Sequence, residues 1–228
     1  MGFFFLQKIC HMRFCQEEGN IFNQNSIIWF ISFDNNDKND RIKTYKGDVM
    51  FVIIAGPSGV GKNTVIEELL KRNSNLRYLM SCSTRKPREH EVGKGYIYLN
   101  FDEMQKKLDN NELFEHEEIH GNIYGTLNSS VQDIIEDKHD YIKDLGVLGQ
   151  KYYVSRLKDK VKIISIYLTC PKDEVEKRLI NRGEQEVAKR LERFDFEESH
   201  KGNFDYVIEN VDLNETVEFI ENKIYPQE

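Results

Sequence analysis

The stretch VMFVIIAGPSGVGKNT, residues 49–64, decides how this sequence folds. Its first part, Val49–Ala55, is a continuous apolar run, as expected of a strand buried on both faces of a parallel sheet. The turn that follows contains three glycines, Gly56, Gly59 and Gly61. Glycine permits a tight turn with inward-facing backbone N–H groups, and the helical spacing after Lys62 adds the positive end of a helix dipole. Together these features predict a loop that binds phosphate groups.

The loop departs at one position from the pattern G-x-x-x-x-G-K-[ST]. Lys62 stands where a lysine reaches the β- and γ-phosphates, but Asn63 replaces the expected Ser or Thr. The amide oxygen of Asn63 can still serve as a ligand, although its longer side chain favours contact with Mg²⁺ through water. We therefore predict that the loop binds ATP with Mg²⁺. The residues assigned to ATP are Gly56, Pro57, Ser58, Gly59, Val60, Gly61, Lys62, Asn63 and Thr64.

The composition is that of one globular domain. Of the 228 residues, 39% are hydrophobic and 31% are charged, enough for a sizeable core. A formal net charge of -7 argues against sequence-independent binding to nucleic acid. The cysteines, Cys10, Cys15, Cys82 and Cys170, show no paired metal spacing. The chain is too large to need disulfides, so we predict a reducing, cytoplasmic location.

The first 49 residues differ from the rest. The apolar run Ile27–Phe33 falls far short of the ~20 residues of a membrane helix, so no membrane association is expected. The polar tract Asp34–Lys43 lacks periodicity and is typical of a disordered linker. Met50 then precedes the first strand. Our hypothesis is that residues 1–49 are a disordered or non-native extension and that translation begins at Met50. A genuine flexible extension is an equally open alternative.

From residue 50 to 228, strand and helix signals alternate. A helix is predicted over Lys62–Arg72, and a final helix begins with the capping box of Asp212 and Glu215. The predicted strands are Val49–Ala55, Tyr78–Ser83, Tyr96–Leu99, Tyr141–Leu145, Val161–Leu168 and Asp205–Ile208. This alternation predicts an α/β, three-layer fold with a mostly parallel sheet.

A second polar loop could bind a phosphate group. The stretch SCSTRKPR, residues 81–88, places Arg85 and Arg88 on either side of Pro87. Two guanidinium groups near a rigid turn suit a dianionic phosphate, although a solvated basic loop is about equally consistent with these residues. Further along the chain, Glu115 could accept hydrogen bonds from two adjacent N–H groups of a purine. By composition alone it is an ordinary surface residue.

These motifs occur in the order seen in guanylate kinases, which this sequence resembles from about Met50 almost to its C-terminus. The motifs are GPSGVGKNT, SCSTRKPR, Tyr96, Phe114-Glu115, Tyr124-Gly125-Thr126, Pro171–Leu179, Arg182-Gly183, Lys189-Arg190-Leu191 and the terminal VIEN. The resemblance implies a P-loop kinase fold with a GMP-binding insertion near residues 81–127 and a short lid near residues 182–190. It also implies transfer of the γ-phosphoryl group of Mg-ATP to GMP, and to dGMP, giving ADP and GDP.

The resemblance assigns the remaining site residues. Guanine would be contacted by Ser81, Glu115 and Thr126. The GMP phosphate would be held by Arg85, Arg88, Tyr96 and Tyr124. The catalytic cations would be Lys62, Arg85, Arg178, Arg182 and Arg190, of which the last three belong to the lid and its supports. Asn210 would lie near the adenine of ATP.

Departures from the family pattern leave alternatives open. Gly146 stands where guanylate kinases usually have a second acidic residue, and the lid is shorter than usual, so Arg193 could replace Arg190. A related kinase acting on a ribose bisphosphate is one alternative function. A noncatalytic binding module is another, although such modules tend to lose the lysine that Lys62 retains. Both a monomer and a homodimer fit the sequence.

Overall fold

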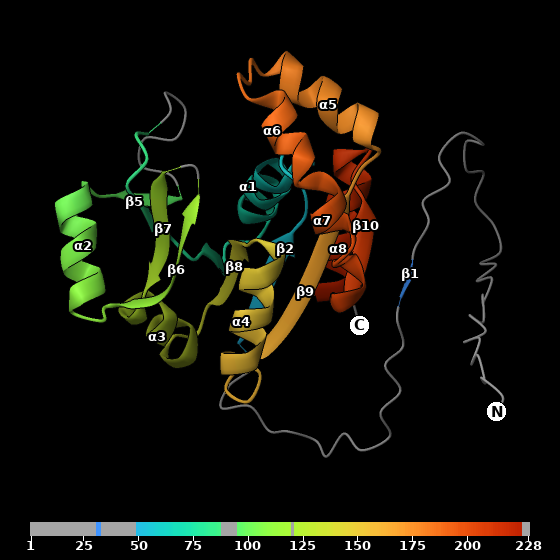
Figure 1. Cartoon of the computed structure of the whole chain (residues 1–228). Coiled ribbons are helices and arrows are strands. Elements are labelled where there is room, and N and C mark those ends of the chain that lie inside the picture. Colours follow the sequence, from blue (N-terminus) through green and yellow to red (C-terminus); the bar gives the residue numbers. More distant parts are fainter. Residues whose placement is uncertain (1–30, 33–48, 88–94, 120, 225–228) are drawn as a thin grey trace, which may run out of the picture.

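The structure is a computed structural model that describes residues 31–32, 49–87, 95–119 and 121–224, and Figure 1 shows its arrangement. Its central sheet has six strands in the order β1-β10-β9-β2-β8-β3. Neighbouring strands from β10 to β3 are parallel, and β1 pairs with β10 in the antiparallel sense. The strands are β1 (Ile31–Ser32), β2 (Met50–Ala55), β3 (Leu76–Tyr78), β8 (Asp140–Asp144), β9 (Lys162–Thr169) and β10 (Tyr206–Glu209).

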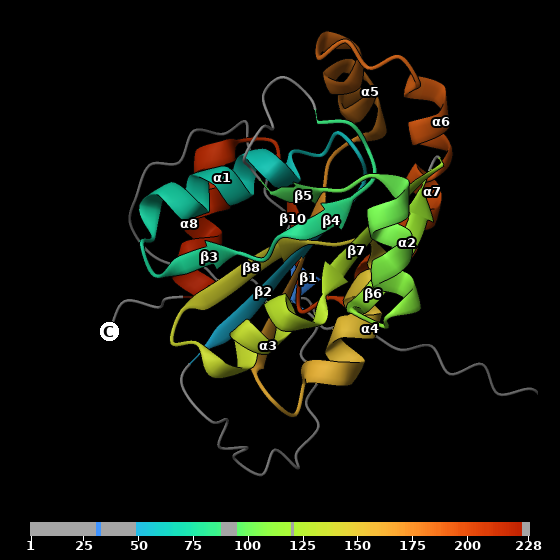
Figure 2. The same cartoon turned by 90° about the vertical axis from the view of Figure 1, so that its left-hand side faces the viewer.

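Helices cover both faces of this sheet. The helices are α1 (Lys62–Arg72), α2 (Phe101–Asp109), α3 (Asn128–Glu136), α4 (Val147–Leu157), α5 (Lys172–Asn181), α6 (Val187–Glu192), α7 (Phe194–Glu198) and α8 (Leu213–Ile224). Figure 2 shows α1 and α8 side by side on one face, and α4 lies against β2 and β9 on the other. The prediction of a three-layer α/β fold is confirmed.

Strand β2 contributes buried side chains to an apolar cluster on each of its two faces. Val52 and Ile54 join the apolar cluster formed with α1 and α8, whereas Phe51 and Ile53 join the cluster formed with α3 and α4. All four side chains are fully buried. Alternate residues of a strand point to opposite faces, so an unbroken apolar sequence is what a central parallel strand requires. The strand predicted over residues 49–55 is therefore confirmed, except that it begins at Met50.

A second, four-stranded sheet has the order β5-β4-β7-β6. Its strands are β4 (Ser81–Ser83), β5 (Tyr96–Tyr98), β6 (Leu113–Ile119) and β7 (Asn122–Leu127). Here β4 and β5 are parallel, while β7 is antiparallel to both β4 and β6. In Figure 1 this sheet stands with α2 to the left of the central sheet. Its strands fall within residues 81–127, the region that the sequence analysis predicted to bind GMP.

Two strand predictions need correction. The single strand predicted over Tyr78–Ser83 is two strands, because Leu79 donates its N–H to Ile142 of the central sheet before the chain crosses to the second sheet. The hairpin of β6 and β7 was not among the predicted strands. Its first strand reads LFEHEEI, which lacks both an unbroken apolar run and regular alternation.

The helix predictions at both ends of the domain agree with the structure. Helix α1 spans Lys62–Arg72 as predicted. Asp212 accepts a hydrogen bond from the backbone N–H of Glu215 at 3.0 Å, as an N-cap residue should. No helix in the described part of the chain is long and apolar enough to cross a membrane. The hypothesis about residues 1–49 falls mainly outside the described residues and stays a prediction.

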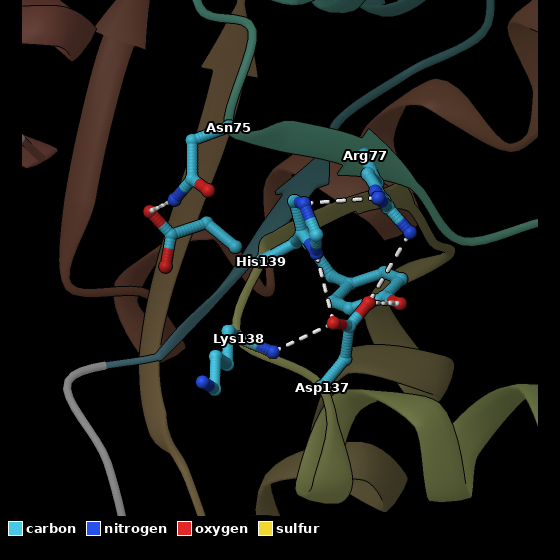
Figure 3. Close-up of polar contacts among 7 residues, drawn as sticks. Asn75, Arg77, Asp137, Lys138 and His139 are labelled. Carbon is cyan, nitrogen blue, oxygen red and sulfur yellow. Dashed lines mark hydrogen bonds and ion pairs between the residues drawn. The ribbon is translucent and has the colours of Figure 1, made fainter.

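A polar network ties the start of β8 to β3 and α3 (Figure 3). The carboxylate of Asp137 accepts hydrogen bonds from the backbone N–H of Lys138 at 2.7 Å and from the hydroxyl of Tyr141 at 2.8 Å. It also lies 2.8 Å from His139 Nδ1 and 3.3 Å from Arg77 Nη1. These contacts, His139 first, hold the pKa of Asp137 well below its usual range. The network therefore stabilises the charged carboxylate in the folded state.

We expect Asp137→Asn to lower the melting temperature at neutral pH, because the amide cannot accept all of these hydrogen bonds. A depressed folded-state pKa means that the stabilisation is fully present above the unfolded value of about 3.9 and is lost progressively as the pH falls from there toward the folded-state pKa. Thermal melts from pH 7 to pH 3 should show the gap between variant and parent closing with acid. Asp133→Asn, on the exposed face of α3, is the control. An unchanged gap at pH 3 would contradict the assignment.

Candidate functional site

One cavity of about 860 Å³ lies between the glycine turn, the second sheet and helices α5 to α7. Most of the residues predicted for the site line it together, although they come from distant parts of the sequence. These residues are Gly56, Ser58, Gly59, Gly61, Lys62, Asn63, Thr64, Ser81, Arg85, Tyr96, Glu115, Tyr124, Arg178, Arg182, Arg190 and Asn210. The cavity thus joins the predicted ATP and GMP regions in one space.

The glycine turn approaches neighbouring strands too closely to allow a side chain at Gly56 or Gly61. Gly56 has φ 140° and Gly61 has φ 100°, values that L-residues with a side chain rarely adopt. A Cβ on Gly56 would lie 2.1 Å from the carbonyl oxygen of Leu168 at the end of β9. One on Gly61 would lie 2.6 Å from Asn210 Nδ2, just after β10. The turn is therefore packed against the ends of two neighbouring strands.

Lys62 lies at the start of α1 with its amine folded over the turn. Its Nζ donates to the carbonyl oxygens of Gly56 at 2.6 Å and Pro57 at 3.0 Å. Burial lowers the pKa of this amine, and the nearby carboxylates of Glu197 and Asp144 act in the opposite direction. A cation held in this way can be turned toward an anionic group in the cavity at little cost, because backbone carbonyls are weaker partners than phosphate oxygens.

Asn210 and Arg178 brace the turn from behind. The buried side chain of Asn210 donates from Nδ2 to the carbonyl oxygen of Val60 at 2.7 Å. Arg178 Nη1 donates to the backbone oxygen of Asn210 at 3.1 Å and to that of Val60 at 3.4 Å. Both residues line the cavity, but these contacts hold its wall in place. Pro57 and Val60, which were also predicted for the site, belong to that wall without facing the cavity.

Two of the arginines predicted for the lid, Arg182 and Arg190, share the carboxylate of Glu184, and Arg190 also contacts the turn. Arg190 Nη1 donates to Ser58 Oγ at 3.1 Å, and its Nε lies 2.7 Å from Glu184 Oε2. That Nε makes no hydrogen bond, so the contact with Glu184 is an ion pair alone. Arg182 Nη2 donates to the same carboxylate at 3.0 Å. Arg193 instead lies 3.9 Å from Glu117 on β6. Of the arginines predicted for the lid, Arg190 is thus the one that touches the glycine turn.

On the opposite side of the cavity, Arg85 lies among tyrosine rings. Its guanidinium carbon is 5.3 Å from the centre of the Tyr96 ring and 5.7 Å from that of Tyr98. Tyr96 in turn meets Tyr124 edge to face, with 6.2 Å between ring centres. These aromatic faces fix the guanidinium group in position. Arg88, the other predicted phosphate ligand, lies outside the described residues.

The predicted base-binding residues form two hydrogen-bonded groups. Glu115 Oε1 accepts from Thr126 Oγ1 at 2.7 Å and from the hydroxyl of Tyr153 at 3.4 Å. Ser81 Oγ accepts from Lys143 Nζ at 2.5 Å. Thr126 is fully buried behind Glu115 and does not line the cavity, so its place is that of a residue orienting the carboxylate.

Several residues of the site were missed by the sequence analysis. Lys143, Asp144 and Glu197 line the cavity, and the hydroxyl of Tyr78 donates to Asp144. Lys143 could have been noticed, because it falls in a predicted strand on the same face as the apolar Tyr141. Gly146 lines the cavity as the N-cap residue of α4, and a Cβ there would meet nothing within 4 Å. The space for the missing carboxylate is therefore open.

A glycine turn carrying a lysine between a buried parallel strand and a helix defines the class of P-loop nucleotide-binding proteins. Within that class, the guanylate kinase family model matches residues 49–226. The chain belongs to the guanylate kinase family.

Individual relatives cover most of the domain. A guanylate kinase of Thermotoga maritima is 35% identical over 173 residues, which make up 74% of this chain and 82% of that protein. One from Prochlorococcus marinus subsp. pastoris is 38% identical over 171 residues, 73% of this chain and 91% of the relative. The crystal structure of guanylate kinase from Anaplasma phagocytophilum matches with a TM-score of 0.64 at 28% identity, covering 78% of this chain and 86% of that one.

The packing of the turn predicts the effect of Gly61→Ala. The new methyl group would collide with Asn210, and a positive φ costs a further 1 kcal/mol or so. We expect a lower melting temperature and ATP binding weakened by about tenfold or more, measured by calorimetry. Gly121→Ala is the matched control, because Gly121 has φ 72° but open space around its Cβ position. Equal ATP affinity in both variants would contradict the close packing described here.

Proposed function

We propose that this protein transfers the γ-phosphoryl group of Mg-ATP to GMP, and to dGMP, giving ADP and GDP. One observation carries the proposal: a single cavity brings the glycine turn with Lys62 to face Arg85 and its tyrosines. Two phosphate-binding regions that share one space suit a donor and an acceptor of a phosphoryl group. Membership of the guanylate kinase family supports GMP as the acceptor.

The donor side would act through positioning and charge. Phosphoryl transfer passes through a loose transition state with charge spread over the transferred oxygens, so no covalent intermediate with the protein is needed. Lys62 would exchange its carbonyl partners for phosphate oxygens. Arg190 and Arg182, held by Glu184, would neutralise the developing charge from the lid side. Arg178 and Asn210 would keep the turn in shape.

The acceptor side would bind GMP through its phosphate group and through its base. Arg85 can donate paired hydrogen bonds to the GMP phosphate, with Tyr96 and Tyr124 beside it and Arg88 assigned to the same phosphate from the sequence. Neutralising that phosphate lets one of its oxygens approach the donor. Glu115 would accept from the base, because its Oε1 is already oriented by Thr126. The contact between Arg193 and Glu117 would bring the lid and the acceptor sheet together and exclude water.

Mg²⁺ fits the turn as a companion of ATP. The side chains of Asn63 and Thr64 are exposed at the cavity and offer oxygen atoms beside Lys62. Mg²⁺ prefers oxygen ligands and is commonly held by one or two protein groups together with substrate phosphates and water. When bound, the ion would offset negative charge on the phosphates of ATP. We propose that Asn63 holds it through a water molecule.

Two buried cysteines and the lining of the cavity bear on the proposed location and assembly. Cys82 and Cys170 are buried free thiols, which supports a reducing, cytoplasmic location. The described residues of one chain line the cavity from the donor side to the acceptor side, so a monomer can hold both substrates. A homodimer is equally compatible with this arrangement.

A coupled ADP-release assay tests the proposed reaction. GMP, dGMP, AMP, UMP and a ribose bisphosphate would be offered with ATP, with and without Mg²⁺. We expect metal-dependent turnover with GMP and dGMP. Turnover with the ribose bisphosphate alone would favour the related sugar kinase, and GMP binding without turnover would favour a noncatalytic module.

Arg85→Ala should raise the KM for GMP much more than the KM for ATP. The variant loses charge-assisted hydrogen bonds worth about 1.5–3 kcal/mol, which corresponds to roughly ten- to a hundredfold. Steady-state kinetics with each substrate varied in turn would measure both constants. Arg156→Ala, which removes an exposed arginine stacked on Tyr152, is the control. An unchanged KM for GMP in Arg85→Ala would reject the assigned acceptor site.

Asn63→Ser should lower the Mg²⁺ concentration needed for half-maximal activity, because a hydroxyl at this place can reach the ion directly. Metal titrations at saturating ATP and GMP would show the shift. Lys62→Ala should instead nearly abolish turnover at every metal concentration. If the parent shows no metal-dependent transfer and Asn63→Ser creates it, the turn is degenerate and the proposed function is wrong.

A further inference from the structure

The central sheet contains a buried lysine that the proposed reaction does not use. Lys143 lies in β8 with 1% of its surface exposed, opposite the fully buried Ile53 of β2. Alternation along β8 places it on the same face as Tyr141, which belongs to the apolar cluster formed with α3 and α4. Lysine is almost never fully buried unless it is paired, so this position calls for a specific cause.

The amine of Lys143 is held by two oxygen atoms. Its Nζ donates to Ser81 Oγ at 2.5 Å and to the backbone carbonyl of Leu79 at 3.3 Å. Burial lowers its pKa, while Asp144 and Glu115 favour the charged form. No ion pair within 4 Å joins Lys143 to a carboxylate of the described residues. The short contact with Ser81 is therefore its main local interaction.

This contact decides what the Ser81 hydroxyl can do. A charged amine has three donors and no acceptor, so Ser81 Oγ must accept from Lys143. Its own proton then has to point elsewhere, and no acceptor for it is found among the described residues. Ser81 is half-buried and lines the cavity, so that proton is available to a ligand.

We propose that Lys143 is a positioning residue that fixes the Ser81 hydroxyl as a hydrogen-bond donor and thereby makes the site select a 6-oxo purine over a 6-amino purine. The inference rests on the proposed function, which places the base of the acceptor nucleotide here. Guanine presents an acceptor oxygen at C6, whereas adenine presents an amino donor there. A hydroxyl free to rotate could serve either base. With Lys143 on one of its two lone pairs, the Ser81 hydroxyl is oriented with its proton toward the cavity, and this orientation matches guanine.

Glu115 completes the selection. Its Oε1 is engaged by Thr126 and Tyr153, which leaves Oε2 as an acceptor at the cavity. A donor at Ser81 and an acceptor at Glu115 match the adjacent O6 and N1–H of guanine and oppose the reversed pattern of adenine. Sites built on such paired groups reject an analogue strongly, because the mismatch leaves buried polar groups unpaired.

Lys143→Met tests the inference, because methionine has a similar length and no donors. Dissociation constants for GMP and AMP would be measured by calorimetry, together with kcat and KM for GMP. We expect the affinity ratio of GMP to AMP to fall by about tenfold. The KM for GMP should rise with little change in kcat, and the melting temperature should not fall, because an apolar side chain suits the buried position. Lys162→Met, at the exposed start of β9, is the matched control.

Ser81→Ala and the double variant Ser81→Ala/Lys143→Met test whether Lys143 acts through Ser81 or contacts the base directly. If Lys143 acts through Ser81, Ser81→Ala alone lowers the ratio and adding Lys143→Met lowers it no further. A ratio that stays at the parent value in Ser81→Ala, which can be measured even if Lys143→Met does not fold, would overturn the inference. Additive losses in the double variant would overturn it too. Absence of GMP binding and turnover in the parent would refute the proposed function instead.

Discussion

The close approach of the glycine turn to the ends of β9 and β10 is the constraint on which the site depends. Gly56 meets the backbone of Leu168 and Gly61 meets the side chain of Asn210, at distances that exclude a Cβ. Parallel strands end at the same edge of a sheet, so the turn after β2 necessarily faces its neighbours there. This packing fixes the turn, so that Gly56, Gly59, Gly61 and Lys62 line the cavity. Helices α5 to α7 and the second sheet contribute further side chains to a cavity wall whose position the central sheet determines.

The charges of the cavity are arranged in pairs that a nucleotide could rearrange. Glu184 holds both Arg182 and Arg190, and it is only 13% exposed. Burial raises the pKa of Glu197, which lies close enough to influence Lys62 and Arg193. A protein with a net charge of -7 can still attract phosphates here, because its cations are local and partly buried. The carboxylates keep the cations in position without saturating their donors.

The sequence predicted the donor half of the site better than the acceptor half, for a physical reason. Strand β2, the turn and α1 are continuous in the chain, and each has a strong local pattern, so even the bounds of α1 could be predicted. The acceptor half depends on β6 and β7, whose polar residues face a cavity and therefore lack a regular pattern. The break between Tyr78 and Ser81 is set by where the two sheets lie, and no local signal in these residues encodes it. The residue types of Arg85 and Glu115 suggest phosphate and purine binding, but the roles of Ser81, Tyr96, Tyr124 and Thr126 could be inferred only from family resemblance.

The end of β8 contributes residues to both the donor half and the acceptor half of the site. Asp144 shares a face with Ile142, toward α1, and accepts a hydrogen bond from Tyr78 near the turn. Lys143 points to the opposite face and reaches Ser81 of the second sheet. Both residues stand at the carboxyl edge, where the apolar alternation of the strand gives way to polar groups. Burying the amine of Lys143 costs stability, and a well-packed apolar residue would avoid that cost. Its presence on a buried face is therefore better explained by the hydroxyl that it orients than by the packing of the core.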